Sequence, residues 1–217
     1  MKTVSSFDRP RLVAREVHVW NAALDDPGWP GSEQLPAPDR ERVSRFLLEE
    51  PARRWEASRW VLRRVLARYL EVEPAAVELE VGEHGKPRLR GAGGLDFNLS
   101  HSGGLALVAV AGCAVGVDIE AIRPDRELAA LADRGLPAED AEAVRTVGPA
   151  DRPAVFYRAW ARHEARLKCI GTGLGSSPPP AQVAVADLDV DPGYAAAVAV
   201  AGSEIGPLRL RVLNPGD

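Results

Sequence analysis

The stretch from Leu95 to Glu120 constrains the fold more than any other part of the sequence. It contains an unbroken apolar run, Leu105 to Ala111, which has the length of a strand buried on both faces. A polar segment, Phe97 to Ser102, comes before this run, and two glycines between them allow a sharp turn. After a short turn, residues 115–120 alternate, with Val, Val and Ile on one side and Gly, Asp and Glu on the other. We therefore expect a polar loop, a buried strand, a turn and a second strand that ends in acidic residues.

Over the whole chain one order of elements occurs twice: a strand, helices and strands, then again a strand, helices and strands. The expected helices are 38–48, 51–70, 126–133, 138–147 and 154–170, and the expected strands are 13–20, 77–81, 105–111, 115–120, 183–190, 195–201 and 208–213. This order predicts an α+β fold with two pseudo-symmetric halves. The predicted boundary divides the chain into an N-terminal half, 1–113, and a C-terminal half, 114–217.

Composition excludes several classes of protein. The 217 residues are 46% hydrophobic and 27% charged, which is typical of a soluble globular protein. A net charge of −4 argues against bulk attraction to nucleic acid or to an anionic membrane. The first 17 residues contain no apolar run of signal-peptide length, and no segment of the chain approaches the length of a membrane span. We expect a cytoplasmic protein whose two cysteines are buried thiols.

Three carboxylates are candidates for a metal site. Asp118 and Glu120 share one face of a strand, with backbones roughly 6–7 Å apart. Glu164 lies one helical turn before Lys168 at the edge of an apolar helix face, where an ordinary exposed ion pair is the alternative. Carboxylates with open positions for water and phosphate suit Mg²⁺, and the lack of His or Cys at ligand spacing argues against zinc.

Candidates for phosphate binding surround this acidic group. His101 lies between Ser100 and Ser102, before two glycines, and hydroxyl, imidazole and turn amides all donate to phosphate. Lys86 and Lys168 are further phosphate partners, and Arg54, at the edge of the helix 51–70, has the fork geometry for one. The alternatives are a histidine held in a loop network and a solvated arginine surface. From the residues alone we infer a Mg²⁺-dependent phosphate or pyrophosphate site with no named substrate.

The sequence resembles the 4′-phosphopantetheinyl transferases, of the two-half monomeric type that activates surfactin and enterobactin synthetases. The resemblance covers about residues 46–174. It rests on four blocks in the family's order, which are Gly85-Lys86-Pro87, Phe97 to Ser102, Gly116 to Glu120, and Trp160 to Leu174. An arginine-rich helix that contains Arg54 and Arg59 is a weaker fifth block.

The resemblance implies a transfer of the 4′-phosphopantetheine arm of coenzyme A, bound in a cleft between the halves, to a serine of an apo acyl or peptidyl carrier protein. Asp118, Glu120 and Glu164 would hold Mg²⁺ against the pyrophosphate. Glu164 would act as the general base, directly or through a metal-bound water, and Lys168 would support the leaving 3′,5′-adenosine diphosphate. The residues implied to hold coenzyme A are Arg54, Lys86, Ser100, His101 and Lys168. A monomer that binds neither nucleic acid nor membrane is expected.

One departure from the family concerns His163, which stands where the family usually has lysine. An imidazole there would weaken a phosphate contact and make activity more sensitive to pH. Other readings of the sequence are a non-catalytic coenzyme A- or carrier-binding homologue with a regulatory role, and an unrelated Mg²⁺-dependent phosphohydrolase. A nucleic-acid-binding protein fits less well, because acidic residues are interspersed among the arginines of the helix 51–70.

Overall fold

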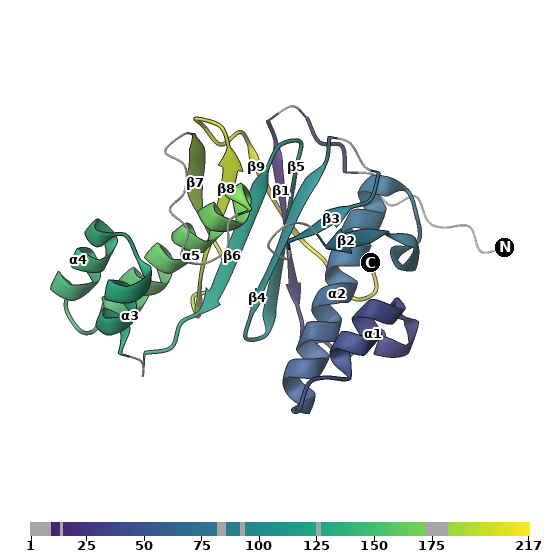
Figure 1. Ribbon diagram of the computed structural model, residues 1–217, viewed down its shortest axis with the longest axis horizontal. Helices are drawn as coiled ribbons and strands as arrows, with labels where there is room; N and C mark the ends of the chain where they lie inside the picture. Colours follow the sequence, from purple (N-terminus) through teal and green to yellow (C-terminus); the bar gives the residue numbers. More distant parts are fainter. Residues whose placement is uncertain (1–9, 14, 82–85, 92–93, 125–126, 172–181) are drawn as a thin grey trace.

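A computed structural model describes residues 10–13, 15–81, 86–91, 94–124, 127–171 and 182–217. The fold is α+β and is built from two halves that lie side by side (Figure 1). Each half packs one long helix against an antiparallel core of strands, as the order of elements predicts. No helix among these residues is long and apolar enough to cross a membrane.

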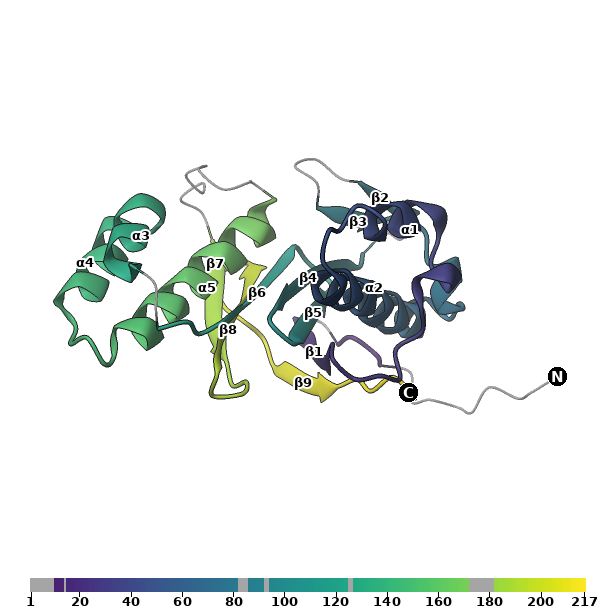
Figure 2. The same ribbon diagram turned by 90° about the horizontal axis from the view of Figure 1, so that it is seen from below.

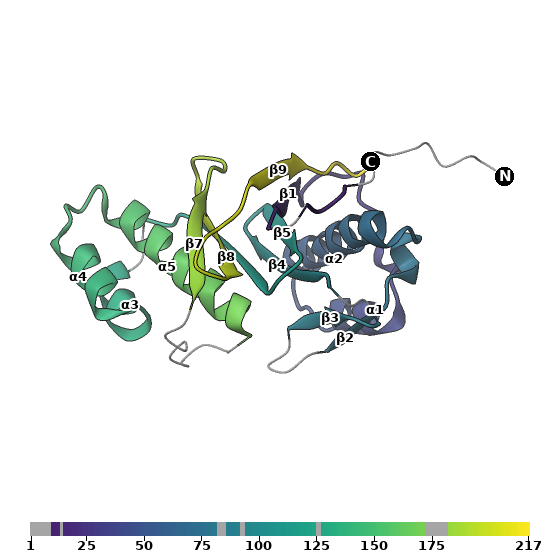
Figure 3. The same ribbon diagram turned by 90° about the horizontal axis from the view of Figure 1, so that it is seen from above.

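The first half contains a four-stranded sheet in the order β4-β5-β1-β9. Its strands are β1 (Val17–Ala23), β4 (Asp96–Ser102), β5 (Leu105–Ala111) and β9 (Leu208–Val212). Strand β9 runs parallel to β1, so the end of the chain returns from the second half to the first sheet (Figure 3). The long helix α2 (Glu49–Leu70) covers one face of this sheet, and its aliphatic side chains form a core with β1, β4 and β5.

The second half contains a three-stranded antiparallel sheet in the order β6-β8-β7. Its strands are β6 (Val115–Ala121), β7 (Val183–Leu188) and β8 (Tyr194–Ala201). Helix α5 (Arg152–Ile170) packs on one face of this sheet through alanines and a cysteine. Two shorter helices pack against α5 at the end of the molecule far from α2 (Figure 1). They are α3 (Leu128–Gly135) and α4 (Ala138–Thr146).

The remaining elements cover the other side of α2. Helix α1 (Ala37–Val43) packs against α2, and two short strands form a hairpin beside it. The strands are β2 (Leu79–Val81) and β3 (Pro87–Leu89), and two 3₁₀ turns span Ser32–Gln34 and Pro74–Ala76.

The two sheets face each other across a shared apolar core. Val19 and Leu107 from the first sheet pack with Val117, Ile119 and Val198 from the second. The core layers therefore follow the order helix, sheet, sheet, helix, with α2 and α5 each covering the outer face of one sheet (Figure 2). This arrangement leaves β4 and β6 as neighbouring strands from different sheets.

Most expected elements are confirmed, and the exceptions have physical reasons. Residues 97–102, expected as a polar loop, form strand β4, because Phe97 and Leu99 alternate with polar residues and pack under α2. The short strand β3 was not expected. Cys113 is exposed rather than buried because it lies in the turn between β5 and β6, whereas Cys169 is buried.

Candidate functional site

The centre of the candidate site is Asp118, a carboxylate that is only 3% exposed. Its Oδ1 accepts a hydrogen bond from Ser100 Oγ at 2.8 Å and one from Lys168 Nζ at 2.5 Å. The Lys168 ammonium also donates to Ser100 Oγ at 3.0 Å. These three side chains come from β6, β4 and α5, so the cluster ties the two sheets and the second long helix together at one point.

Gly116 explains why α5 comes close enough for this contact. A β-carbon at this position would lie 2.1 Å from the carbonyl oxygen of Ala165 and 2.4 Å from the backbone nitrogen of Cys169. The backbone of α5 therefore packs directly on β6, with no side chain between them. Because Gly116 and Asp118 face the same side of β6, the approach of α5 at Gly116 brings Lys168 beside Asp118.

Two further carboxylates lie near Asp118. Glu120 Oε2 accepts a hydrogen bond from Ser102 Oγ at 3.1 Å. Burial raises the pKa of Glu120, and the negative charge of Asp118 adds to the rise. Burial likewise raises the pKa of Glu164, with Lys168 opposing the rise and Asp118 adding to it. The three carboxylates are therefore close enough to repel one another.

Two oxygens in this group are buried without a hydrogen-bond partner in the described structure, namely Asp118 Oδ2 and Glu164 Oε1. Buried acceptors of this kind normally have a partner, so the pair indicates a place for a cation. Within the described ranges no three His, Cys, Asp or Glu side chains already form a compact metal-binding group. The donor set nevertheless fits Mg²⁺, which commonly takes one or two carboxylates and completes its shell with water and substrate phosphate.

His101 points to the opposite side of β4 from Ser100, toward α2. Its pKa is lowered by partial burial and by the positive charges of Lys168 and Arg59. Arg59 is held by Asp39, whose Oδ1 accepts from Arg59 Nε at 3.0 Å, and its guanidinium lies over the ring of Trp55. The region around His101 therefore carries two cationic side chains and suits an anion. Arg59 was not among the predicted site residues. Its position in the helix pattern did not distinguish it from the neighbouring arginines.

Lys86 and Arg54 lie apart from the Asp118 cluster. Lys86 Nζ donates to Asp96 Oδ2 and to the carbonyl oxygen of Val115, both at 2.9 Å, at the start of β6. Arg54 forms a two-pronged pair with Asp25, at 2.9 and 2.8 Å, and a second ion pair with Glu50. Their predicted contacts with coenzyme A stay predictions.

Comparisons with known proteins decide the family. The model of the 4′-phosphopantetheinyl transferase superfamily matches residues 114–204, and that of the N-terminal region of 4′-phosphopantetheinyl transferase matches residues 28–113. The chain is 36% identical over 213 residues to the 4′-phosphopantetheinyl transferase HetI of Nostoc sp., covering 88% of this chain and 90% of that one. The chain belongs to the 4′-phosphopantetheinyl transferase family.

Other members of the family are also similar. A 4′-phosphopantetheinyl transferase of Bacillus subtilis is 28% identical, covering 72% of this chain and 71% of its own length. The transferase AcpT of Salmonella typhimurium is 34% identical, with coverage of 72% and 76%. The resemblance found from the sequence blocks and the enzyme class that it implied are thus confirmed.

The family's last block contains His163 and ends outside the described residues, at 172–174. His163 is half-buried on α5, and burial lowers its pKa, while Asp140 of α4 opposes this and Arg166 adds to it. His163 therefore lies on the side of α5 that faces α4. The expected effect on a phosphate contact stays a prediction.

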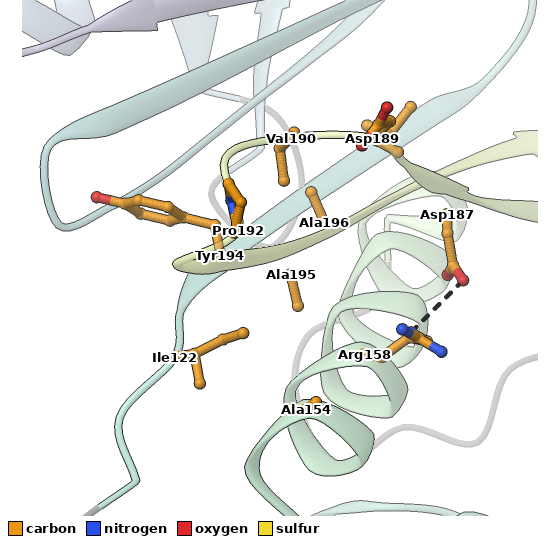
Figure 4. A pocket seen from close by; sticks show the side chains of 11 residues that line it. Ile122, Ala154, Arg158, Asp187, Asp189, Val190, Pro192, Tyr194, Ala195 and Ala196 are labelled. Atoms are coloured by element: carbon orange, nitrogen blue, oxygen red, sulfur yellow. Dashed lines mark ion pairs between the residues drawn. The ribbon is translucent and has the colours of Figure 1, made fainter. Parts of the chain in front are cut away.

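A separate hollow of about 300 Å³ lies between the start of α5 and the β7–β8 hairpin (Figure 4). Apolar residues, among them Ile122 and Ala195, line much of it, and Arg158 and Asp187 form an ion pair of 3.8 Å at its side. Tyr194 also lines it, and its hydroxyl accepts a hydrogen bond from the Gly104 amide of the first half. We assign no ligand to this hollow.

Proposed function

We propose that this transferase moves the 4′-phosphopantetheine arm of coenzyme A to a serine of an apo acyl or peptidyl carrier protein. The serine oxygen attacks the β-phosphorus of the pyrophosphate. The bond to the bridging oxygen breaks, and 3′,5′-adenosine diphosphate leaves. The observation that carries the proposal is the similarity to the Nostoc transferase over nearly the whole of both chains. We further propose that the protein acts as a cytoplasmic monomer.

The candidate site supports a role for Mg²⁺ in this reaction. We propose that Asp118, Glu120 and Glu164 hold the ion, on the basis of the two unpartnered oxygens of Asp118 and Glu164. When bound, Mg²⁺ would neutralise charge on the pyrophosphate and make its phosphorus easier to attack. The carboxylates would also relieve their mutual repulsion by sharing a cation.

Two residues of α5 would act on the reacting atoms. Glu164 would accept the proton of the serine hydroxyl, and its raised pKa brings its basicity closer to working pH. Lys168 would stabilise the charge that develops on the departing adenosine diphosphate. Its ammonium already lies 2.5 Å from Asp118 Oδ1, at the centre of the site.

Coenzyme A would be held mainly by the first half, through Arg54, Lys86, Ser100 and His101, with Lys168 reaching in from the second. The cationic surroundings of His101, to which Arg59 contributes, suit a phosphate group. The division into residues 1–113 and 114–217 would then separate coenzyme A contacts from metal ligands. Since the cluster around Asp118 draws side chains from both sides of this boundary, we expect neither half to be active alone.

A non-catalytic homologue is the other candidate, but it is less favoured. The similar proteins are named as transferases, and all the carboxylates and the lysine proposed for catalysis are present in this chain.

The test is intact-protein mass spectrometry of apo carrier proteins incubated with this protein, coenzyme A and Mg²⁺. We expect the carrier mass to increase by one phosphopantetheine arm. The gain should disappear in Glu164→Gln and in a chelated sample. Glu142→Gln, which changes an exposed glutamate on α4, serves as the matched control and should transfer like the unmodified protein.

Several types of carrier protein are needed, because a failure to modify one of them would show only that this carrier is not a substrate. Tight coenzyme A binding with no mass gain on any carrier would overturn the proposal and favour the non-catalytic homologue. Full activity in Glu164→Gln would leave the reaction standing but remove Glu164 from it.

A further inference from the structure

Strands β4 and β6 are joined by a ladder of side-chain to backbone hydrogen bonds. The side chain of every second residue of β4 accepts a hydrogen bond from the backbone N–H of every second residue of β6. The rungs are Asp96 Oδ2 to Val115 N at 2.8 Å, Asn98 Oδ1 to Val117 N at 2.8 Å, Ser100 Oγ to Ile119 N at 3.4 Å, and Ser102 Oγ to Ala121 N at 3.0 Å. Both strands have a repeat of two residues, so the rungs stay in step along the whole contact.

This ladder replaces ordinary strand pairing at the junction of the halves. Among the described strands, β4 pairs through its backbone with β5, and β6 pairs with β8. The amides of β6 that point away from β8 would otherwise be unpartnered at a buried junction. The lengthwise position of β6 along β4 is therefore fixed by polar side chains of β4.

The rungs differ in what else they do. Asp96 also binds Lys86, while Ser100 and Ser102 also bind Asp118 and Glu120. Asn98 is 5% exposed, and its rung ends on Val117, the residue directly before Asp118. Unlike the other three rungs, the Asn98 rung makes no described contact with a proposed catalytic or ligand-binding side chain, and it lies next to Asp118 in the sequence of β6.

We propose that Asn98 is a positioning residue that holds Asp118 in place for the transfer reaction by fixing β6 against β4. This inference rests on the function proposed above. A small slide of β6 along β4 would separate Asp118 Oδ1 from Ser100 Oγ, which it meets at 2.8 Å. It would also change how Asp118 and Glu120 together face a cation.

The deciding variant is Asn98→Leu, which keeps the branched shape and the number of side-chain heavy atoms and removes the acceptor. Asn98→Asp keeps an acceptor oxygen at the same place and is the conservative variant. The matched control is Asn21→Leu on β1, in the same sheet but outside the ladder, where the carboxamide oxygen has no hydrogen-bond partner within the described structure. Each variant is measured as the full-length protein with coenzyme A, Mg²⁺ and an apo carrier.

We expect Asn98→Leu to lower kcat by about 10- to 100-fold, with KM for coenzyme A changed by less than about threefold, because the reacting geometry is displaced while the binding surface remains. Amide hydrogen exchange, read by nuclear magnetic resonance, should speed up at Val117 and Ile119. Calorimetric titration of Mg²⁺ in the presence of coenzyme A should show weaker binding. Asn98→Asp should retain Val117 protection and more of kcat than Asn98→Leu.

The inference is overturned if Asn98→Leu loses protection at Val117 but keeps kcat and Mg²⁺ binding at the level of Asn21→Leu. Should Asn98→Leu not fold, the same comparison is made with Asn98→Ala, whose side chain has no acceptor and therefore also loses the rung. An inactive wild-type protein, by contrast, would refute the proposed function, so the two failures are distinguishable.

Discussion

Helices α2 and α5 occupy equivalent places in the two halves but rest on their sheets in different ways. The buried face of α2 carries large aliphatic side chains, including Leu62, Val65 and Leu66, which are 0% exposed. The part of α5 that packs on β8 carries small ones, Ala161, Ala165 and Cys169, against alanines of that strand. Large side chains hold a helix backbone away from a sheet, whereas small ones allow it to come close.

This difference separates two tasks of the molecule. The close approach of α5 puts Lys168 within hydrogen-bond distance of Asp118 on β6. Helix α2 carries Arg59, which acts on His101 of β4 through its charge. In the proposed function, the half with the small residues would assemble the reacting groups, and the half with the large residues would provide stable support and the Arg59 charge beside His101.

The largest effect is expected where the close approach is tightest, at Gly116. In Gly116→Ala the new β-carbon would overlap backbone atoms of α5, 2.1 Å from the Ala165 oxygen, and no side-chain rotation relieves this. We expect a loss of unfolding free energy above about 4 kcal/mol, which is exceptional for one substitution. Urea unfolding measures it.

The matched control for this prediction is Gly148→Ala, because a β-carbon there meets nothing within 4 Å. It should change the unfolding free energy by less than about 0.5 kcal/mol. Equal stabilities for the two alanine variants would contradict direct packing of the α5 backbone on β6.

The first half should be sensitive to the opposite change, the removal of volume. Leu66→Ala should cost about 3 kcal/mol because it leaves a cavity under α2. Since α5 carries the proposed reacting groups, kcat of the folded variant should stay within about threefold of wild type. Urea unfolding and a transfer assay below the melting range check both statements.

Leu47→Ala removes the same atoms from a side chain that is 98% exposed, and it should be nearly neutral. A folded Leu66→Ala protein with a tenfold loss of kcat would show that α2 also holds the reacting groups, and the division of tasks would be wrong.

The sequence predicts much of this fold because hydrophobic periodicity reports burial. Both long helices and the buried strand Leu105–Ala111 follow directly from their patterns. Strand β4 was harder to predict because its polar residues face another strand instead of solvent. Serine and asparagine are typical of loops. Their hydrogen bonds to β6 could not be predicted, because β6 lies further along the sequence and comes beside β4 only in the folded protein.

The candidate site could be predicted as residue types but not as a network. Alternation alone indicated that Asp118 and Glu120 share a face. Nothing in the pattern indicated that Lys168 would bind Asp118, or that Asp25 would bind Arg54, since ion pairing between distant segments depends on the packed fold. The sequence named Arg59 within the arginine-rich helix, but its place beside His101 was missed for the same reason.

The smallest predicted effect concerns the other joint between the halves, where β9 returns to β1. Arg209 Nε on β9 donates to Glu16 Oε1 at 2.6 Å, and this bond is the main reason that the pKa of Glu16 falls from 4.5 to about 2. A folded-state pKa below the unfolded value contributes stability that is present above pH 4.5 and is lost as pH falls toward 2. We therefore expect Arg209→Met to lower Tm at pH 7.

The difference in Tm between wild type and Arg209→Met should shrink below pH 4.5 and be largely lost at pH 2, as Glu16 becomes protonated. Arg15→Met is the matched control, because Arg15 pairs with Glu204 in an exposed contact worth little. A difference that persists unchanged to pH 2 would mean that Arg209 supports β9 through packing and not through Glu16. The ladder between β4 and β6 would then be the joint of the halves that depends on polar contacts, and the β9 joint would depend on its backbone pairing with β1.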